Sequence, residues 1–169
     1  MPRRHRLCLP QALAVYERIV VALDGSPVAE RCLPHVEALA EKFGSTVILV
    51  RAILPAAQVA TVIEPSIGGV ALDPDLIEDT IETEEQEART YLEHVGKVLR
   101  GKGLKVETQI PEGSAVQAIV DCAKRLQADL IALTTHGRSG LARLFFGSVA
   151  EGILKSAPCP VLVIRVANP

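Results

Sequence analysis

Unbroken runs of branched apolar residues limit most strongly how this chain can fold. They lie within the segments 17–24, 45–52, 129–134 and 161–165. None of these runs alternates apolar with polar residues, which favours strands buried on both faces, as in a parallel sheet between two layers of helices. The segment 104–110 does alternate and predicts a half-exposed edge strand. The sequence therefore predicts five strands.

Helical apolar spacing fills the intervals between these strands. The first predicted helix spans 27–43, with Ser26 as its N-cap and Gly44 as its stop. Pro34 lies inside this helix, where its missing N–H is expected to break a backbone bond and kink the chain. Further helices are predicted at about 73–100, 115–126 and 148–156.

The alternation of strands and helices predicts an α/β fold with a parallel sheet. We expect five strands in the order 3-2-1-4-5, open at both edges, with helices on both faces. A single domain is expected at 17–166, after a poorly ordered tail at 1–16. The segment 53–72 has no clear periodicity and is expected to be a variable loop near the site.

Charge and composition exclude several classes of partner. The 169 residues carry a net charge of -2, which gives no general attraction for nucleic acid or an anionic membrane. No apolar run approaches the ~20 residues that span a bilayer. The four cysteines are scattered without a CxxC pair. We therefore expect reduced thiols and a cytoplasmic protein without a metal cluster.

Several common motifs are missing from the chain. It contains no Gly-x-x-x-x-Gly-Lys-[Ser/Thr] loop of the P-loop NTPases and no Gly-x-Ser-x-Gly elbow. The turn after the first strand lacks Gly-x-Gly-x-x-Gly, and the second strand ends in Arg51-Ala52 rather than in an acid. A nicotinamide dinucleotide site is therefore disfavoured.

The segment from Leu133 to Ser148 joins the fourth strand to the last helix through a glycine-bearing loop. Backbone N–H groups and the positive end of a helix dipole would converge there, which suits a phosphate. In a sheet of the predicted order, ligands bind beyond the carboxyl ends of strands one and four. Asp24, Gly25 and Ser26 would then face the loop that begins at Thr134.

Two blocks of the sequence resemble the universal stress protein family. One is Ile-Val-Val-Ala-Leu-Asp-Gly-Ser at 19–26, and the other runs from Leu133 to Arg165 and ends in Ala-Pro-Cys-Pro-Val-Leu-Val-Ile-Arg. The ATP-binding members of the family carry Gly-x-x-Gly, nine residues, and Gly-[Ser/Thr] after the fourth strand. Gly137, nine residues and Gly147-Ser148 match this pattern, while Thr134 replaces its first glycine. The resemblance covers about residues 16–166 and implies a Rossmann-like, adenine nucleotide alpha hydrolase-like fold.

The resemblance also implies a set of nucleotide-binding residues. Asp24 would lie near the ribose or a phosphate bridged by Mg²⁺, and Ala52 would offer its backbone to adenine. The sugar and phosphates would be lined by the residues that leave the fourth strand: Thr134, Thr135, His136, Gly137 and Arg138. The last helix would present backbone N–H groups from its first residues: Gly147, Ser148, Val149 and Ala150.

Plainer roles for four of these residues stay open. Asp24 could only cap the turn that follows it, and Ser148 could only be an N-cap. His136 could be a loop histidine held by a carbonyl, and Arg138 an exposed surface cation. No carboxylate or nucleophile is placed beside His136 by the sequence, so no catalytic residue is assigned.

The expected function is an ATP-binding stress-response module that acts as a nucleotide-dependent switch with Mg²⁺, with ADP or AMP as other ligands. Hydrolysis would be slow at most, because no general base and no P-loop lysine is evident. The chain is expected to form a homodimer through the apolar edge strand Val161–Arg165. The alternative, which Thr134 favours, is a dimeric interaction protein of the same fold that binds no nucleotide.

Overall fold

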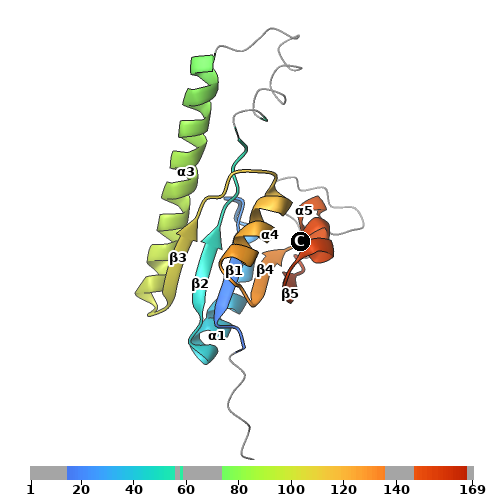
Figure 1. The fold of residues 1–169 in the computed structure, drawn as a ribbon. Helices are drawn as coiled ribbons and strands as arrows, with labels where there is room; N and C mark the ends of the chain where they lie inside the picture. The colour runs from blue at the N-terminus through green and yellow to red at the C-terminus, as the bar shows by residue number, and fades with distance from the viewer. Residues whose placement is uncertain (1–14, 56–57, 59–73, 136–146, 167–169) are drawn as a thin grey trace, which may run out of the picture.

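The computed structural model of the chain describes residues 15–55, 58, 74–135 and 147–166, and contains a five-stranded parallel sheet (Figure 1). Its strands are β1 (Arg18–Ala22), β2 (Thr46–Val50), β3 (Lys105–Gln109), β4 (Leu130–Thr134) and β5 (Val161–Ile164). Their order is β3-β2-β1-β4-β5, and every neighbouring pair is parallel. The predicted fold class and strand order are confirmed.

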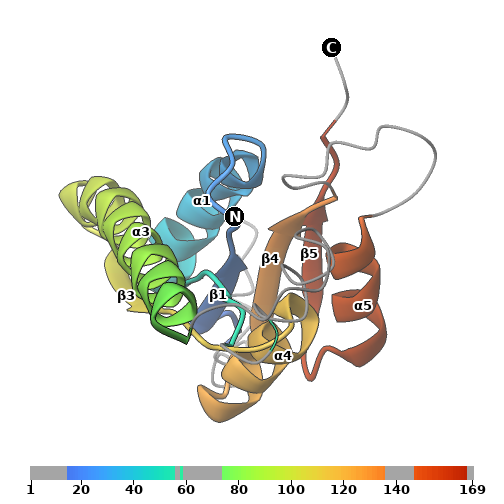
Figure 2. The ribbon, with the colours of Figure 1, turned by 90° about the horizontal axis from the view of Figure 1, so that it is seen from above.

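Within the described residues, four α-helices cover the two faces of the sheet (Figure 2). They are α1 (Leu33–Phe43), α3 (Pro74–Gly101), α4 (Ala115–Arg125) and α5 (Ser148–Ser156). Helices α1 and α3 lie on one side of the sheet, and α4 and α5 lie on the other. None of the described helices is both long and apolar enough to cross a membrane.

Each central strand is buried on both faces, and this explains the unbroken apolar runs. Ile19 and Val21 of β1 point into the core beneath α1 and α3. Val20, between them, points into the core beneath α4 and α5. All three side chains are fully buried. Because successive side chains of a strand point to opposite faces, a strand covered on both sides needs an apolar residue at every position.

The segment after β1 differs from the predicted single helix at 27–43. A 3-10 helix, η1 (Ala29–Cys32), comes first, and α1 begins only at Leu33. Pro34 therefore lies in the first turn of α1, where no partner within the helix awaits its missing N–H. The predicted kink within a helix is wrong for this reason. Gly44 ends α1 as predicted, in the left-handed conformation with φ 73.

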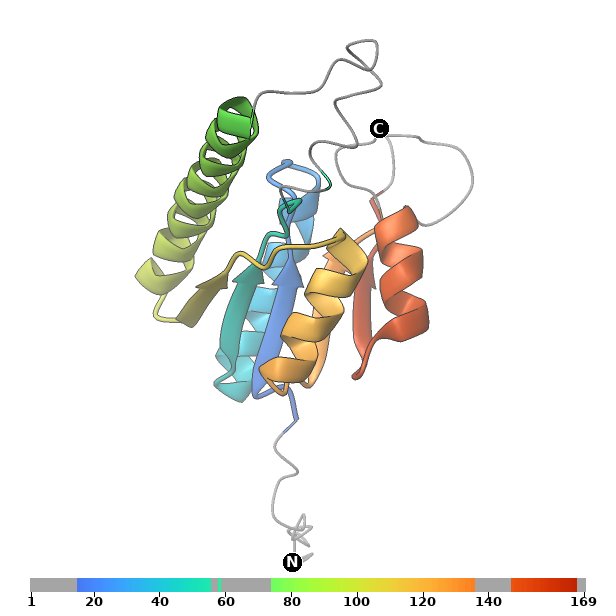
Figure 3. The ribbon, with the colours of Figure 1, turned by 45° about the horizontal axis from the view of Figure 1, so that its top comes forward.

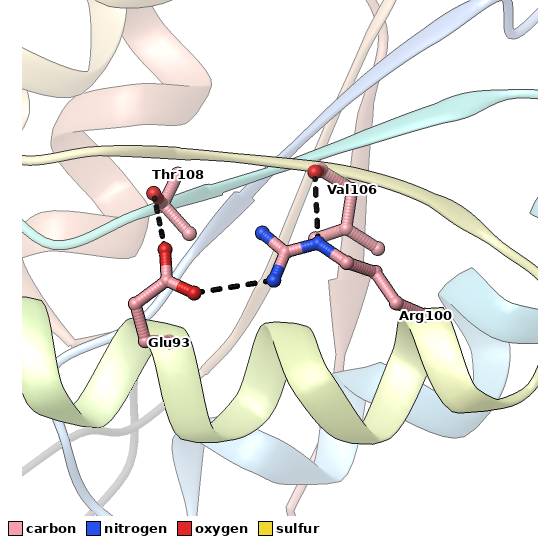
Figure 4. Close-up of polar contacts among 4 residues, drawn as sticks. All are labelled: Glu93, Arg100, Val106 and Thr108. Carbon is pink, nitrogen blue, oxygen red and sulfur yellow. Dashed lines mark hydrogen bonds and ion pairs between the residues drawn. The ribbon is translucent and has the colours of Figure 1, made fainter.

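The edge strand β3 is attached to α3 by polar contacts (Figure 4). Glu93 accepts hydrogen bonds from Arg100 Nη1 at 3.1 Å and from Thr108 Oγ1 at 3.4 Å. Arg100 Nε also donates to the carbonyl of Val106 at 3.4 Å. These contacts join the C-terminal half of α3 to β3, beside the apolar packing of Leu92, Val95 and Leu99 in the core.

Short backbone hydrogen bonds continue the sheet beyond the ends of its strands. The N–H of Leu23 donates to the carbonyl of Val50 at 2.8 Å, and that of Thr135 to Ile164 at 3.0 Å. The loops after β1, β2 and β4 therefore begin at fixed places along one edge of the sheet, its carboxyl end. In Figure 3 the strand arrowheads point to this edge.

Candidate functional site

The first half of the predicted site is the turn that follows β1. Gly25 has φ 83, a left-handed conformation that favours glycine. Oδ1 of the half-buried Asp24 accepts hydrogen bonds from the N–H of Ser26 at 2.9 Å and from its hydroxyl at 2.6 Å. Ser26 Oγ in turn accepts from the N–H of Ala29 at 3.1 Å and so closes the turn before the 3-10 helix, whose N-cap residue is Val28 and not Ser26 as predicted. Asp24 thus caps the turn, and its carboxylate has a fixed orientation at the carboxyl end of β1.

The second half of the predicted site is the end of β4. Thr134 and Thr135 are both buried, with 7% and 6% of their surface exposed. The carbonyl of Thr135 accepts a hydrogen bond of 2.6 Å from the N–H of Gly147. Thr135 Oγ1 accepts a longer one, 3.4 Å, from the N–H of Val166. Thr135 therefore attaches both the start of α5 and the end of β5 to β4.

The start of α5 corrects one expectation and excludes the plainer role left open for Ser148. The N–H of Gly147 is bonded to Thr135 within the protein, so it does not point to a ligand as predicted. Gly147, not Ser148, is the N-cap residue, and no side chain caps the helix. Ser148 is the first helical residue instead. Its N–H and those of Val149 and Ala150 lie in the first turn, where a helix offers them no backbone acceptor.

Strand order brings these two halves together. β1 and β4 are hydrogen-bonded neighbours with Ile19 paired to Leu130, so Asp24 and Thr135 both lie at the carboxyl edge of adjacent strands. This is the point where the chain reverses its winding direction, and ligands of open α/β sheets bind there. Ala52 lies half-buried one strand further along, after β2. The remaining predicted residues, His136, Gly137 and Arg138, lie outside the described residues.

Arg51, Tyr91 and Glu30 lie near this crevice and were not predicted from the sequence as site residues. Arg51, at the end of β2, is only 5% exposed, and its guanidinium carbon lies 5.7 Å from the centroid of the Tyr91 ring. Burial raises the pKa of Tyr91, and the carboxylates of Glu30 and Asp24 raise it further. Tyr91 on α3 therefore lies close to the turn after β1. The one feature of the sequence that could have pointed to Arg51 is its position as a single charged residue directly after an apolar strand.

The described residues offer few side chains that could bind a divalent cation. No group of three or more His, Cys, Asp or Glu side chains within the described ranges could hold a metal ion. Mg²⁺ is commonly held by one or two carboxylates together with the phosphates of its substrate. Asp24 is the predicted carboxylate at this crevice. It could hold Mg²⁺ together with the phosphates of a bound nucleotide, but one carboxylate does not form a metal site by itself.

The sheet order and the place of the site at its switch point put the protein among the Rossmann-like α/β proteins. Residues 15–165 match the model of the universal stress protein family, and the chain belongs to this family. Universal stress protein MJ0531 of Methanocaldococcus jannaschii is 34% identical over 152 residues, which cover 89% of this chain and 83% of the relative.

Solved structures are similar over nearly the whole chain. Protein MJ0577, from the same archaeon, has a TM-score of 0.77 at 28% identity, with 92% of this chain and 99% of that chain covered. A universal stress protein from Archaeoglobus fulgidus, solved in complex with dAMP, has a TM-score of 0.60 at 26% identity. That comparison covers 89% of this chain and 98% of the other.

Proposed function

We propose that this protein is a nucleotide-binding module of the universal stress protein family that takes ATP, or ADP or AMP, in the crevice between β1 and β4. The observation that carries this is the hydrogen bond between Gly147 and Thr135, which holds the start of α5 at the carboxyl end of β4. The free N–H groups and positive dipole of that helix end attract a phosphate. The relative from Archaeoglobus fulgidus, solved with dAMP, supports an adenine nucleotide as the ligand.

In this proposal the protein acts as a switch rather than as an efficient enzyme. Phosphates would bind at the N–H groups of Ser148, Val149 and Ala150, and Asp24 would hold Mg²⁺ together with them. Asp24 Oδ1 already accepts two hydrogen bonds from Ser26, so the carboxylate is engaged in the turn, and the sequence contains no P-loop lysine motif. Hydrolysis would therefore be slow, and occupancy of the site would carry the signal.

Isothermal titration with ATP and Mg²⁺ tests the proposal, together with two variants of Ser148. Ser148→Pro removes the N–H and the hydroxyl at the first helical position, where proline is well tolerated. Gly147 before it has ψ 153, the extended conformation that a following proline requires. Ser148→Ala removes the hydroxyl alone and is the matched control.

We expect Ser148→Pro to bind ATP about 10–100-fold more weakly than Ser148→Ala, the value of one hydrogen bond to a charged group. Absence of any heat or ligand displacement with wild-type protein up to millimolar ATP would overturn the proposal. Equal affinity of the two variants would show that phosphate does not use this amide.

The second candidate is an interaction protein of the same fold without a nucleotide. Thr134 favours it, because a buried threonine stands where the ATP-binding members have the first glycine of their motif. Denaturation of protein purified without added nucleotide distinguishes the candidates. Release of a compound with adenine absorbance supports nucleotide binding. If no such compound is released and wild-type protein does not bind ATP in the titration, the result supports the interaction protein.

A homodimer is part of both candidates. β5 is the last strand of the sheet order, and all four of its apolar side chains are only partly buried in the single chain. Such an edge is usually paired or covered. We expect light scattering to give the mass of a dimer at micromolar concentration, and Val163→Lys on β5 to shift it towards a monomer. A wild-type monomer would contradict this.

A further inference from the structure

The N-terminal half of α3 is a strongly acidic surface. The helix has 28 residues, and Figure 1 shows that its N-terminal half extends beyond the sheet. Residues 75–87 contain seven acidic side chains and no lysine, arginine or histidine. Of the α3 side chains that the structure describes, the first that is buried in the core is Ala88. The fold therefore leaves a concentrated negative charge outside the core.

Two adjoining grooves run along this acidic half of the helix. One, of about 960 Å³, is lined by Asp79 and Glu87 of α3, among others, and by Arg51 at the end of β2. The other, of about 430 Å³, is lined by Asp79, Glu84 and Glu87, among others. Asp79, Thr83 and Glu87 line both grooves and, spaced four residues apart, form one ridge between them. A hollow on each side of an acidic ridge suits a ligand that is longer than a single small molecule.

The carboxylates of this ridge are not neutralised within the described part of the chain. Glu85 forms an ion pair with Arg89, but Asp79 and Glu87 form none with any described residue. Acidic residues three or four positions apart, such as Glu84 and Glu87, repel each other along a helix. A positively charged ligand would relieve this repulsion and would gain affinity from it.

The guanidinium of Arg51 needs hydrogen-bond acceptors that the described residues do not supply. The side chain is 5% exposed and lines the larger groove, where its guanidinium carbon lies 5.7 Å from the centroid of the Tyr91 ring. It forms no hydrogen bond or ion pair with a described residue, although buried polar groups are normally paired. The carbonyl groups of an extended peptide are suitable acceptors. A basic peptide offers such carbonyl groups to Arg51 and cations to the ridge.

The chain itself contains a segment of this chemistry. Residues 3–6 read Arg-Arg-His-Arg, and no acidic residue precedes Glu17. Arg6 comes nine residues before Val15, and Arg3 comes twelve residues before it. Fully extended chains of these lengths span ~30 Å and ~40 Å.

The larger groove lies within that reach of Val15. Arg18 pairs with Thr46 at the start of β2, and Arg51 follows five residues later, ~17 Å further along the sheet. Val15 comes three residues before Arg18, which adds ~10 Å at most. Tyr16 packs against the core beneath α1 and α3, so this end of the described chain lies on the side of the sheet that carries α3.

We propose that the basic segment 3–6 binds the acidic ridge of α3 in the same chain. Its arginines lie beside Asp79 and Glu87, and its peptide carbonyls accept hydrogen bonds from the Arg51 guanidinium. The segment thereby neutralises the half of α3 that extends beyond the sheet. Because ion pairs at a surface are individually weak and are screened by salt, this contact is strong only at low ionic strength. It does not require a bound nucleotide.

Substitutions in the segment give the first test. Spectra of the ¹⁵N-labelled whole chain are compared between wild type and Arg3→Gln/Arg4→Gln/Arg6→Gln at ionic strengths of about 0.01 M and 1 M. The Debye length falls from about 30 Å to about 3 Å between these conditions. We expect the amide resonances of Thr83 and Glu87 to differ between the two proteins at low salt and to coincide at high salt.

A control variant removes the same charge elsewhere. Lys105→Gln/Lys124→Gln/Lys155→Gln neutralises three exposed cations on β3, α4 and α5. It should leave the α3 resonances of the wild type in place at both salt concentrations. If the arginine variant also leaves them in place at low salt, the inference is wrong.

A nitroxide label tests proximity directly. Cys32 and Cys122 are buried, so Cys159→Ser leaves Cys8 as the thiol to label, two residues after Arg6. We expect the label to broaden the amide signals of α3 around Thr83 at low salt. High salt, or Asp79→Asn/Glu87→Gln, should restore them. Absence of broadening would overturn the proposal.

A mixed sample separates binding within one chain from binding between two copies. It combines ¹⁵N-labelled chain without nitroxide and unlabelled chain that carries the nitroxide on Cys8. We expect no broadening of the α3 signals in this sample. Broadening as strong as in the doubly labelled chain would show that the segment binds a second copy, and the assignment to the same chain would be wrong.

Discussion

The hydroxyl of Ser26 donates a hydrogen bond of 2.6 Å to Oδ1 of Asp24 while its oxygen accepts one from the N–H of Ala29. One side chain therefore fixes the orientation of the carboxylate and the start of the 3-10 helix η1. The Ser26 N–H donates to the same Oδ1, so this oxygen has two donors within a single turn. Asp24 is consequently held in place before any ligand arrives, which lowers the entropy that binding would cost.

We predict that Ser26→Ala lowers the free energy of unfolding by about 1 kcal/mol, the usual cost of losing a side-chain hydrogen bond. Ser26→Thr keeps the hydroxyl and should remain close to wild type. Urea denaturation measures both. ATP affinity should fall with Ser26→Ala and recover with Ser26→Thr. Equal stability of the alanine variant and wild type would contradict this role of the hydroxyl.

The sequence could predict the sheet because its signal is local and repeated. Unbroken apolar runs mark β1, β2 and β4, and Gly44 marks the end of α1, since each depends only on neighbouring residues and burial. The errors concern helix starts. Pro34 was placed inside a helix and Ser26 at its N-cap, because several residues in a row can begin a helix and tertiary contacts choose between them.

The candidate site was predictable only in part for a related reason. Asp24 could be placed opposite the end of β4 because the strand order follows from the alternation of elements. The pairing of Arg51 with Tyr91 joins positions 40 residues apart, on a strand end and a long helix. No periodicity or motif encodes such a contact. The hydrogen bond from Gly147 to Thr135 likewise joins two residues that no local pattern relates.

Helices α4 and α5 approach closely at Gly152. A Cβ atom at this position would lie 2.6 Å from Cγ2 and 3.0 Å from Cγ1 of Val116. Alanine normally stabilises a helix by up to about 1 kcal/mol relative to glycine. Here overpacking against a stiff β-branched side chain costs about 1–3 kcal/mol, so we predict that Gly152→Ala destabilises the protein.

Thermal or urea unfolding checks this, with Gly101→Ala as the control, since a Cβ at Gly101 would meet no atom within 4 Å. Adding Val116→Ala to Gly152→Ala should restore part of the loss, which makes the two substitutions non-additive. Stability of Gly152→Ala at or above the wild-type value would show that the two helices separate without cost.

The contacts of Glu93 with Arg100 and Thr108 are expected to make a small, salt-dependent contribution to the free energy of unfolding. Glu93 is 53% exposed and Arg100 41% exposed, so water screens their attraction. We expect Glu93→Gln to lower the free energy of unfolding by about 0.2–1 kcal/mol at low salt and by less in 1 M NaCl. Urea titrations at both salt concentrations measure this, with the exposed Glu82→Gln as the control. A large loss that persists in 1 M NaCl would mean that the contact acts through packing instead.

Ionisation of the Cys32 thiol is expected to lower the free energy of unfolding as the pH rises into the alkaline range. Burial raises the pKa of Cys32 from 9.0 to about 12, and its Sγ donates to the carbonyl of Ala29 at 3.1 Å. The folded chain therefore keeps this proton over a pH range in which the unfolded chain releases it. The stabilisation is complete below pH 9 and is lost as the pH rises from 9 towards 12.

In that range each pH unit should lower the free energy of unfolding by about 1.4 kcal/mol through this one group. Cys32→Ala has no thiol and should lose stability with pH less steeply, although it starts lower because a small void remains. Urea unfolding between about pH 8 and 10.5 compares the two slopes. Both proteins keep Tyr91, whose raised pKa contributes equally to each at the upper end. Equal slopes would show that the Cys32 thiol ionises in the folded protein as it does in the unfolded chain.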